Sequence, residues 1–325
     1  MNVDMVSTLC PVCKATQCRF FRQAPDMRYG IGGPFVLVQC DDCSCVYLNP
    51  RPKDEALGRW YPPSYHRMWQ RQVKEGRGST LLDNRQRAEI TIRQFPTPGC
   101  LLDVGCGIGL YVKEMRDRGW DAIGVEISGE GTRVGRTELG VTIYNGPLRV
   151  TRLPRASFDI ITMWHVFEHL CDPMEELCEI RDLLKTSGHV LVAIPNIESV
   201  SARIFGQYWY PLDLPRHLIF PTRLAMDRIV RNAGLEIVGY SANMMEQNLN
   251  AWVMSIGRLA KYFWTPPKPS NAAETRASEN DTTDQCDSRI KEWIACFLRG
   301  AVYPLEKVER LWGYPSTHEY LLRKI

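Results

Sequence analysis

The sequence predicts an α/β fold in which a mostly parallel sheet carries helices on both faces, preceded by a small metal-binding module. Three observations support this prediction. After Pro98, short apolar runs alternate with amphipathic helical segments, which is the pattern of a parallel sheet. A glycine-rich turn follows the first of these runs, as at a ligand-binding strand end. Two Cys-x-x-Cys pairs within the first 43 residues have the spacing of a zinc ribbon.

Length and composition set the broad class. A chain of 325 residues has room for one large domain and a small appendage, because single cores stop growing at roughly 250–300 residues. No run of about 18 apolar residues occurs and the first residues lack a secretion signal, so we expect a cytoplasmic protein without a transmembrane segment. A formal net charge of +3 does not predict nucleic-acid binding. Function must therefore be inferred from motifs.

The first cysteines of the chain form two knuckles with metal-ligand spacing. The expected zinc ligands are Cys10, Cys13, Cys40 and Cys43, with 26 residues between the two pairs. Four thiolates leave no open position for water, so the expected zinc is structural. A redox pair is the alternative, but that chemistry needs a single Cys-x-x-Cys near a βαβ unit. Cys18 and Cys45 are further candidate ligands with poorer spacing.

Residues 1–50 are expected to form this zinc-ribbon module, and residues 51–98 a linker with a leading helix. Residues 35–39 are interpreted as an extended arm that enters the second knuckle. Prolines at positions 50, 52, 62 and 63 indicate turns, since proline fixes φ and restricts the residue before it. Between positions 66 and 93, seven Lys or Arg stand against three acidic residues. This indicates a solvated helical face, with a basic patch for an anionic partner as the alternative.

The main domain, residues 99–325, contains seven predicted strands separated by helices. The best-defined helix spans residues 172–185. Asp172 is its expected N-cap, Pro173 its first residue, Glu175 the partner in a capping box, and Gly188 lies just past its end. The predicted strands are residues 100–104, 122–126, 141–144, 158–164, 189–194, 235–240 and 319–322.

Two insertions are expected in the main domain. Residues 201–221 follow the fifth strand and lie on the substrate side, because ligands of open α/β sheets bind at the carboxyl ends of the strands. Residues 245–315 form a helical insertion before the last strand, with helices at 250–263 and 289–311. The segment between these helices, residues 265–285, is rich in Pro, Ser, Asn, Thr and acidic residues and is a predicted mobile loop.

The strongest functional signal is the glycine-rich turn after the first strand. Residues 101–109 read Leu-Leu-Asp-Val-Gly-Cys-Gly-Ile-Gly, so an acidic residue near the strand end precedes three glycines. Glycine allows a tight turn and close approach of a ligand where a β-carbon would clash. The second strand ends at Glu126, near the offset that places a carboxylate on a ribose diol.

These residues resemble the class I S-adenosylmethionine-dependent methyltransferases, clearly so over residues 79–240. The resemblance implies a Rossmann-like, mostly parallel seven-stranded sheet and S-adenosylmethionine as cofactor. It implies that the turn with Asp103, Gly105, Gly107 and Gly109 holds the amino-acid end of the cofactor and that Glu126 holds its ribose. Further implied cofactor contacts are Cys106, Ile127, Leu148, Trp164 and His165.

A nicotinamide-dependent dehydrogenase is the competing interpretation of these glycines. Its fingerprint is Gly-x-Gly-x-x-Gly, whereas position 110 is leucine in this chain. An inactive cofactor-binding scaffold is a second alternative from another class. The presence of Asp103, Gly105, Gly107 and Glu126 argues against it. An active methyltransferase is therefore the expected function.

Methyl transfer needs alignment above all, and a base only where the nucleophile is a hydroxyl group. His217, beside Arg216 in the first insertion, is the expected general base, and His165 is the alternative. His165, Glu168 and His169 have i, i+3, i+4 spacing, which brings them to one face of a helix. Their position resembles that of a Glu-x-x-Glu-His group in quinone-modifying O-methyltransferases, with histidine in first place. They are thus either a candidate second metal site or hydrogen-bonding groups at helix ends.

The zinc knuckles, the linker at 47–52 and the core together resemble bacterial methyltransferases of sugar and polysaccharide pathways. This implies a small-molecule acceptor, such as a nucleotide sugar or glycan precursor, methylated on a hydroxyl group or a carbon. Tyr208, Trp209 and Tyr210 suit either stacking on a sugar ring or packing onto the core. A quinone- or lipid-like acceptor is one alternative. Ribosomal or transfer RNA is another, disfavoured by the all-cysteine ligand set and the nearly balanced charge.

Overall fold

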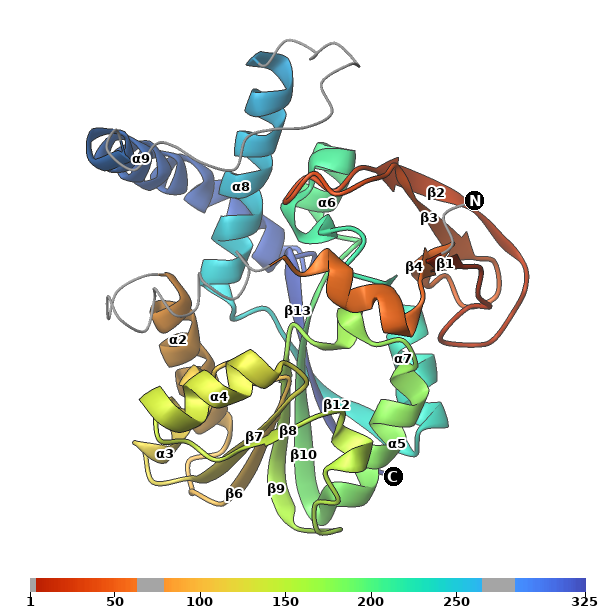
Figure 1. The fold of residues 1–325 in the computed structure, drawn as a ribbon, viewed down its shortest axis with the longest axis vertical. Helices are drawn as coiled ribbons and strands as arrows, with labels where there is room; N and C mark the ends of the chain where they lie inside the picture. The colour runs from red at the N-terminus through yellow and green to blue at the C-terminus, as the bar shows by residue number, and fades with distance from the viewer. Residues whose placement is uncertain (1–3, 63–78, 265–283) are drawn as a thin grey trace.

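The computed structural model of the protein describes residues 4–62, 79–264 and 284–325, and these residues have the predicted α/β architecture (Figure 1). A seven-stranded sheet has the order β12-β13-β10-β9-β6-β7-β8, in which only β13 is antiparallel to its neighbours. The predicted fold class is therefore confirmed. The strands are β6 (Cys100–Val104), β7 (Asp121–Glu126), β8 (Ile143–Asn145), β9 (Phe158–Trp164), β10 (Leu184–Pro195), β12 (Leu235–Ser241) and β13 (Thr317–Lys324).

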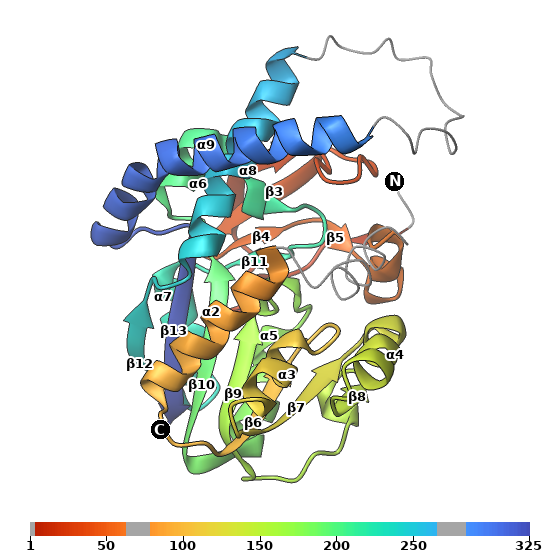
Figure 2. The same cartoon turned by 90° about the vertical axis from the view of Figure 1, so that its left-hand side faces the viewer.

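Helices cover both faces of this sheet (Figures 1 and 2). On one face lie α2 (Ser79–Gln94), α3 (Leu110–Arg116) and α4 (Gly129–Glu138), and on the other α5 (Pro173–Leu183) and α7 (Arg223–Asn232). The long helices α8 (Met245–Trp264) and α9 (Asp284–Leu311) stand at one end of the molecule and pack against each other. Shorter helical turns are η2 (Leu148–Val150), η3 (Phe167–His169), α6 (Val200–Phe205), η4 (Gly206–Tyr208) and η5 (Tyr210–Leu212).

The described residues 4–62 comprise the predicted zinc ribbon and the start of the linker, and are called the N-terminal module from here on. This module shares a sheet with the main domain. Its antiparallel order is β11-β4-β3-β2, formed by β2 (Cys18–Ala24), β3 (Phe35–Cys40), β4 (Val46–Leu48) and β11 (Ile219–Phe220). The strand β11 follows the first insertion of the main domain, and its Ile219 pairs with Tyr47. A pair of short strands, β1 (Met5–Val6) and β5 (Arg51–Pro52), and the turn η1 (Asp54–Trp60) complete the module. Backbone hydrogen bonds thus fix the module to the main domain.

The helix predicted at residues 172–185 ends earlier than expected. Asp172 is its N-cap and accepts hydrogen bonds from the backbone N–H groups of Met174 and Glu175. The carboxylate of Glu175 pairs with Arg149 at the surface instead of closing a capping box. The helix stops at Leu183, and Gly188 lies inside β10, where the strand register shifts between Leu184 and His189. A β-carbon on Gly188 would come within 2.8 Å of the Leu184 side chain, so this glycine serves the irregular strand and not a helix cap.

Several expectations fall on residues that the structure does not describe. The predicted mobile loop at 265–285 lies outside the described residues up to position 283, and α9 begins at Asp284. Residues 66–78 of the basic segment at 66–93 are outside them as well. Of its described members, Arg87 does not fit a solvated face, because its guanidinium lies 5.6 Å from the ring centre of Trp164. In the described ranges, every helix is too short or too polar to cross a bilayer.

Candidate active site

A cavity of about 750 Å³ opens at the carboxyl ends of β6, β7 and β9, the edge at which open α/β sheets bind ligands. Its walls come from four parts of the chain. The strand ends of the main sheet form one wall, and α2 with α8 a second. The first insertion supplies a third wall, and the N-terminal module a fourth.

The glycine-rich turn shapes the first wall. Gly105, Gly107 and Gly109 have φ angles of 68°, 58° and 78°, in the left-handed region that glycine adopts without strain. The turn is held from below, because the N–H groups of Gly105 and Cys106 donate to the carbonyl of Val125. Gly105 and Gly107 therefore present backbone, and not side chains, to the cavity that they line.

Glu126 lies at the end of β7 beside this turn and lines the cavity. Its carboxylate accepts hydrogen bonds from the N–H groups of Gly107, at 2.8 Å, and Ser128, at 2.7 Å. An ionised carboxylate only accepts hydrogen bonds, which matches the donor hydroxyls of a ribose. The glycine backbone and this acceptor thus fit a nucleoside-bearing cofactor.

The structure places the other predicted cofactor residues in two groups. Cys106, Ile127, Trp164 and His165 line the cavity, whereas Asp103, Gly109 and Leu148 do not. Asp103 lies beneath the turn, where its carboxylate accepts a 2.7 Å hydrogen bond from Thr162 and where burial raises its pKa to about 7. Gly109 is the N-cap of α3, and a β-carbon there would come within 2.7 Å of Val141.

His165 and Glu168 form a pair at the exit of β9. His165 has a φ of 59°, an uncommon value for a non-glycine residue. Its Nδ1 atom lies 3.2 Å from Oε1 of the fully buried Glu168. Burial alone would raise the pKa of Glu168, but this hydrogen bond and the nearby histidines hold it below its ordinary value. Because an ionised carboxylate only accepts, Nδ1 carries the proton and Nε2 is the basic atom of the neutral ring.

His217 is held differently in the first insertion. Its Nδ1 atom donates to the carbonyl of Pro211 at 2.7 Å, and its Nε2 atom lies 4.0 Å from Oε1 of Glu168. Burial and the neighbouring His169 lower the pKa of His217 to about 4. The ring lines the cavity but is therefore a weak base near neutral pH.

The predicted metal group is rearranged. Glu168, His169 and His217 bring ligand atoms within 4.8 Å of one another, whereas His165 is not part of this cluster. His169 is engaged elsewhere through Nδ1, which lies 2.9 Å from the carbonyl of Arg216 and 3.1 Å from the hydroxyl of Tyr61. Sequence spacing predicted a shared helical face, but residues 167–169 form a single 3₁₀ turn and leave His165 before it.

Five polar side chains line the cavity from two helices. Asp83, Asn84 and Arg87 belong to α2, and Gln247 and Asn250 to α8. Gln247 donates to the carboxylate of Asp83 at 2.9 Å, which ties the two helices together. These side chains add hydrogen-bonding groups to the wall of the cavity.

The aromatic cluster of the first insertion is split. Only Tyr210 lines the cavity. Trp209 is fully buried and donates to the hydroxyl of Ser201, while Tyr208 packs against Tyr262 with ring centres 5.0 Å apart. The packing role is therefore observed for two of the three residues, and ring stacking on a ligand is geometrically open only to Tyr210.

The four predicted zinc ligands converge in the N-terminal module. Their Sγ atoms lie within 4.8 Å of one another, with 3.5 Å between Cys10 and Cys43 and 3.4 Å between Cys13 and Cys40. The two knuckles have the same backbone form, since Lys14 and Ser44 donate to the carbonyls of the first cysteine in each pair. Cys18 and Cys45 are not members of this cluster.

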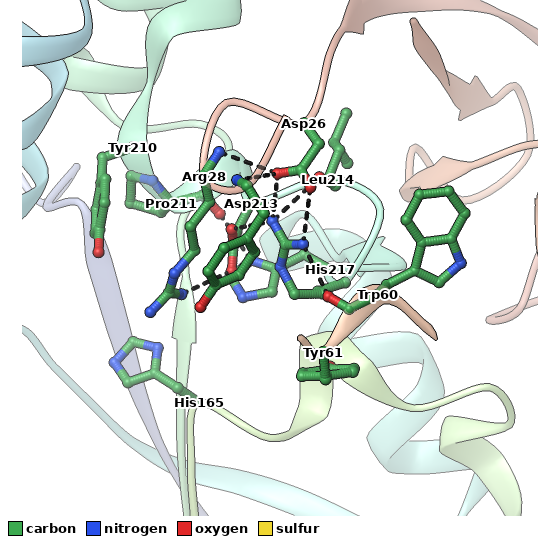
Figure 3. Close-up of polar contacts among 12 residues, drawn as sticks. Asp26, Arg28, Trp60, Tyr61, His165, Tyr210, Pro211, Asp213, Leu214 and His217 are labelled. Atoms are coloured by element: carbon green, nitrogen blue, oxygen red, sulfur yellow. Dashed lines mark hydrogen bonds and ion pairs between the residues drawn. The ribbon is translucent and has the colours of Figure 1, made fainter. Parts of the chain in front are cut away.

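No pattern in the sequence predicts that the N-terminal module reaches this site. Its cavity-lining residues are Arg28, Asp54, Leu57, Gly58 and Tyr61. They stand more than a hundred residues from the histidines that they face, so neither spacing nor periodicity relates them. Figure 3 shows Arg28, Tyr210 and His165 directed toward the same part of the site.

Comparison with known proteins gives a consistent family. The sequence model of a family described as a methyltransferase domain matches residues 70–240. The chain is 29% identical over 168 residues to a ubiquinone biosynthesis O-methyltransferase from Cereibacter sphaeroides, covering 48% of this chain and 67% of the relative. The equivalent protein of Acinetobacter baumannii is 30% identical over 152 residues, covering 42% and 63%. The matches thus span about two thirds of these relatives and less than half of this chain.

Among solved structures, an S-adenosylmethionine-dependent methyltransferase from Archaeoglobus fulgidus is similar to this chain. The sequence identity is 16% and the TM-score 0.47, and the match covers 79% of this chain and 99% of that one.

Proposed function

The chain belongs to the family of methyltransferase domains, whose match covers more than half of it, and on this premise we propose that it methylates a hydroxyl group of a polar, sugar-like small molecule. Its activity as an S-adenosylmethionine-dependent methyltransferase follows from the family and the fold. The acceptor is the proposed part. The observation that carries it is the polar wall of the cavity formed by α2, α8 and the N-terminal module.

The glycine turn and Glu126 are the proposed binding residues for S-adenosylmethionine. The backbone of Gly105 and Gly107 would approach the cofactor closely, and the Glu126 carboxylate would accept hydrogen bonds from its ribose hydroxyls. Arg87 of α2, half-buried beside Trp164, adds a positive charge to the cavity. When bound, S-adenosylmethionine supplies a methyl group on a positively charged sulfur, open to in-line attack by a nucleophile.

His165 is the proposed general base, in preference to His217. The residue lines the cavity, and its Nε2 atom is buried and has no hydrogen-bond partner among the described residues. The neighbouring Glu168 orients the ring through Nδ1 and would stabilise the positive charge that the ring gains. The acceptor hydroxyl would pass its proton to Nε2 as its oxygen attacks the methyl group.

Polar recognition argues against an apolar acceptor. The polar side chains Asp83, Asn84 and Gln247 line the cavity and favour an acceptor with hydrogen-bonding groups of its own over a prenyl chain. A sugar offers hydroxyl groups that donate and accept along its whole rim. A phenolic acceptor remains the second candidate, because the curated relatives are named ubiquinone biosynthesis O-methyltransferases.

We also propose that the four-cysteine cluster holds one structural zinc ion. Tetrahedral zinc with Zn–S bonds of about 2.3 Å places its sulfur atoms roughly 3.8 Å apart. The Sγ separations of 3.5 and 3.4 Å are close to this value. The two matching knuckles on β3 and before β2 supply the ligands in pairs, as a ribbon site requires.

Acceptor choice can be tested directly. The purified full-length enzyme would be incubated with S-adenosylmethionine and, separately, UDP-glucose, dTDP-glucose, free D-glucose and catechol. We expect mass spectrometry to find one added methyl group on a hexose-containing acceptor and none on catechol. Glu126→Ala serves as the inactive control for cofactor-independent labelling. Methylation of catechol alone would replace the sugar proposal with the phenolic one.

A further inference from the structure

We propose that the loop of residues 26–31 in the N-terminal module recognises the acceptor, and that Arg28 donates hydrogen bonds to the acceptor. This inference rests on the proposed function and assigns an acceptor-recognition role to a module otherwise proposed only to bind zinc. The supporting observations are the position of Arg28, the ion pairs that fix its loop, and the sheet that links the loop to the cavity.

Arg28 lines the same cavity as the glycine turn. Its Nη1 atom lies 3.1 Å from Oδ2 of Asp213 in the first insertion, and its side chain is 26% exposed. A guanidinium is planar and carries five N–H donors in a fixed fork, which suits the hydroxyl oxygens of a polar ring. The pairing with Asp213 holds that fork at the cavity wall (Figure 3).

The loop that carries Arg28 is fixed by a single buried carboxylate. Asp26 accepts hydrogen bonds from the backbone N–H groups of Arg28, at 3.0 Å, and Tyr29, at 3.1 Å. The same carboxylate forms a bidentate ion pair with Arg216, with separations of 2.7 and 3.1 Å. Both partners are buried, so solvent screens this pair little. Asp26 is thus a positioning residue for Arg28.

Arg216 carries the connection into the first insertion. Its Nη2 atom also donates to Asp213 at 2.8 Å, and its guanidinium lies 4.8 Å from the ring centre of Tyr29. Asp213 therefore pairs with both Arg216 and Arg28, which places the loop of residues 26–31 and the first insertion in one ion-pair network. His217 directly follows Arg216, so the network also borders the histidines of the site.

The hairpin of β2 and β3 spans the distance between the cysteine cluster and the cavity. At one end Cys18 pairs with the zinc-ligand candidate Cys40, and at the other Ala24 pairs with Phe35. The loop 26–31 lies beyond the Ala24 end, and the opposite edge of the same sheet pairs with β11. The module is therefore built to hold a loop at the site, which a detached metal-binding appendage would not require.

The boundaries of the family match agree with this role. The methyltransferase-domain model begins at residue 70, so Arg28 and the rest of the N-terminal module lie outside it. A shared core that binds the cofactor, combined with a separate module at the acceptor wall, lets acceptor choice change without altering the core. The side chain at position 28 is then a determinant of specificity and not of methyl-donor binding.

The test compares Arg28→Ala and Arg28→Lys with a matched control, Arg19→Ala. Arg19 lies on the same hairpin but pairs with Asp41 at the exposed surface. Each full-length variant is assayed for KM and kcat with UDP-glucose, or with whichever of the four acceptors above the unaltered enzyme methylates fastest. Affinity for S-adenosylmethionine is measured by calorimetry and the melting temperature by scanning fluorimetry.

We expect Arg28→Ala to raise the acceptor KM roughly 10- to 100-fold, the effect of losing a hydrogen bond from a charged group. Arg28→Lys should recover part of this loss, and Arg19→Ala should behave like the unaltered enzyme. Affinity for S-adenosylmethionine should stay within about twofold in all three. An unchanged acceptor KM, or a parallel loss of cofactor affinity, would overturn the inference. The products of the unaltered enzyme identify the acceptor, and the ratio of KM between Arg28→Ala and the unaltered enzyme measures the role of Arg28. A failure of the proposed function is therefore distinguishable from a failure of this inference.

Discussion

Glu168 lies beside both His165 and His217, but it faces Nδ1 of His165 and Nε2 of His217. The Nδ1–H of His165 points at an ionised carboxylate, which favours a positive ring during proton transfer. The Nδ1–H of His217 points at a neutral carbonyl, and burial lowers the pKa of this ring to about 4. A base is most effective when its pKa lies near the working pH, which counts against His217.

We predict that His165→Asn lowers kcat by about 10²- to 10⁴-fold with little change in affinity for S-adenosylmethionine. Asparagine tolerates the positive φ at this position, so the backbone should keep its shape. The matched variant His217→Asn should lose less than about tenfold, because it removes a weak base. Steady-state kinetics and calorimetry provide the two measurements. A larger loss in His217→Asn would return the role of base to His217.

Short-range patterns predicted only one side of the site. The glycines, Glu126 and His165 could be found because a strand, a turn and a helix follow one another closely in sequence. Arg28 and Tyr61 could not, since their approach to the cavity depends on how a separate module docks. The place of Arg87 in the site was missed for another reason. Arg87 belongs to a basic segment whose composition indicates a solvated face, whereas its position on α2 directs its side chain toward Trp164.

At the scale of elements, the cysteine knuckles and the hairpin between them act together. Each knuckle is closed by a backbone hydrogen bond to the carbonyl of its first cysteine, Cys10 or Cys40. Cys40 is also the last residue of β3, so a metal ion there would fix the end of the hairpin. Small metal-binding units commonly depend on the ion for folding.

We predict about one zinc ion per chain, bound by Cys10, Cys13, Cys40 and Cys43. Cys43→Ser should lose the metal, because it removes one of four thiolates from a closed tetrahedral site. Cys18→Ser should keep it, since Cys18 lies outside the cluster. Elemental analysis of protein purified without chelator gives the count. Equal zinc content in both variants, or no metal in the unaltered protein, would contradict the assignment.

Regular elements with strong periodicity were predicted well, and irregular ones were not. β6 and β9 have the predicted bounds, because each is a short buried run between clear turn signals. β10 begins earlier than predicted, since its first residues cross a register shift at Gly188 that hydrophobic pattern does not show. β11 has only two residues and forms because it pairs with β4. Such pairing depends on residues far apart in the chain, so local sequence patterns do not predict it.

At the scale of the whole molecule, two of the contacts between the N-terminal module and the main domain stand out. One is the backbone pairing of β4 with β11. The other is the buried network of Asp26, Arg216 and Asp213. Burying charges is costly, so such a network is stable only when every member is paired, and removal of one member leaves an uncompensated charge. The network therefore couples the integrity of the molecule to the protonation of its carboxylates.

The direction of that coupling follows from the pKa values of the two carboxyl groups. Burial would raise the pKa of Asp26, but the hydrogen bonds from Arg216 and from the backbone of Tyr29 hold it below its ordinary value. The pKa of Asp213 is likewise lowered against the effect of burial, by His217 and by its two arginine partners. A carboxyl group whose pKa is lower in the folded state stabilises the fold above its ordinary pKa of about 3.9. This stabilisation is lost as the pH falls through the lowered folded value.

We therefore predict that Asp26→Asn lowers the free energy of unfolding by about 3 kcal/mol at pH 7, the scale of breaking one side of a buried ion pair. The difference from the unaltered protein should narrow below about pH 4, where Asp26 of the unfolded chain begins to take up a proton. Asp41→Asn is the matched control, because its pair with Arg19 is exposed and should contribute less than about 1 kcal/mol. Urea unfolding at pH 7, 5 and 3 measures these differences. A difference that stays constant across this range would mean that the charge of Asp26 is not the cause, and that charge pairing does not hold the module in place.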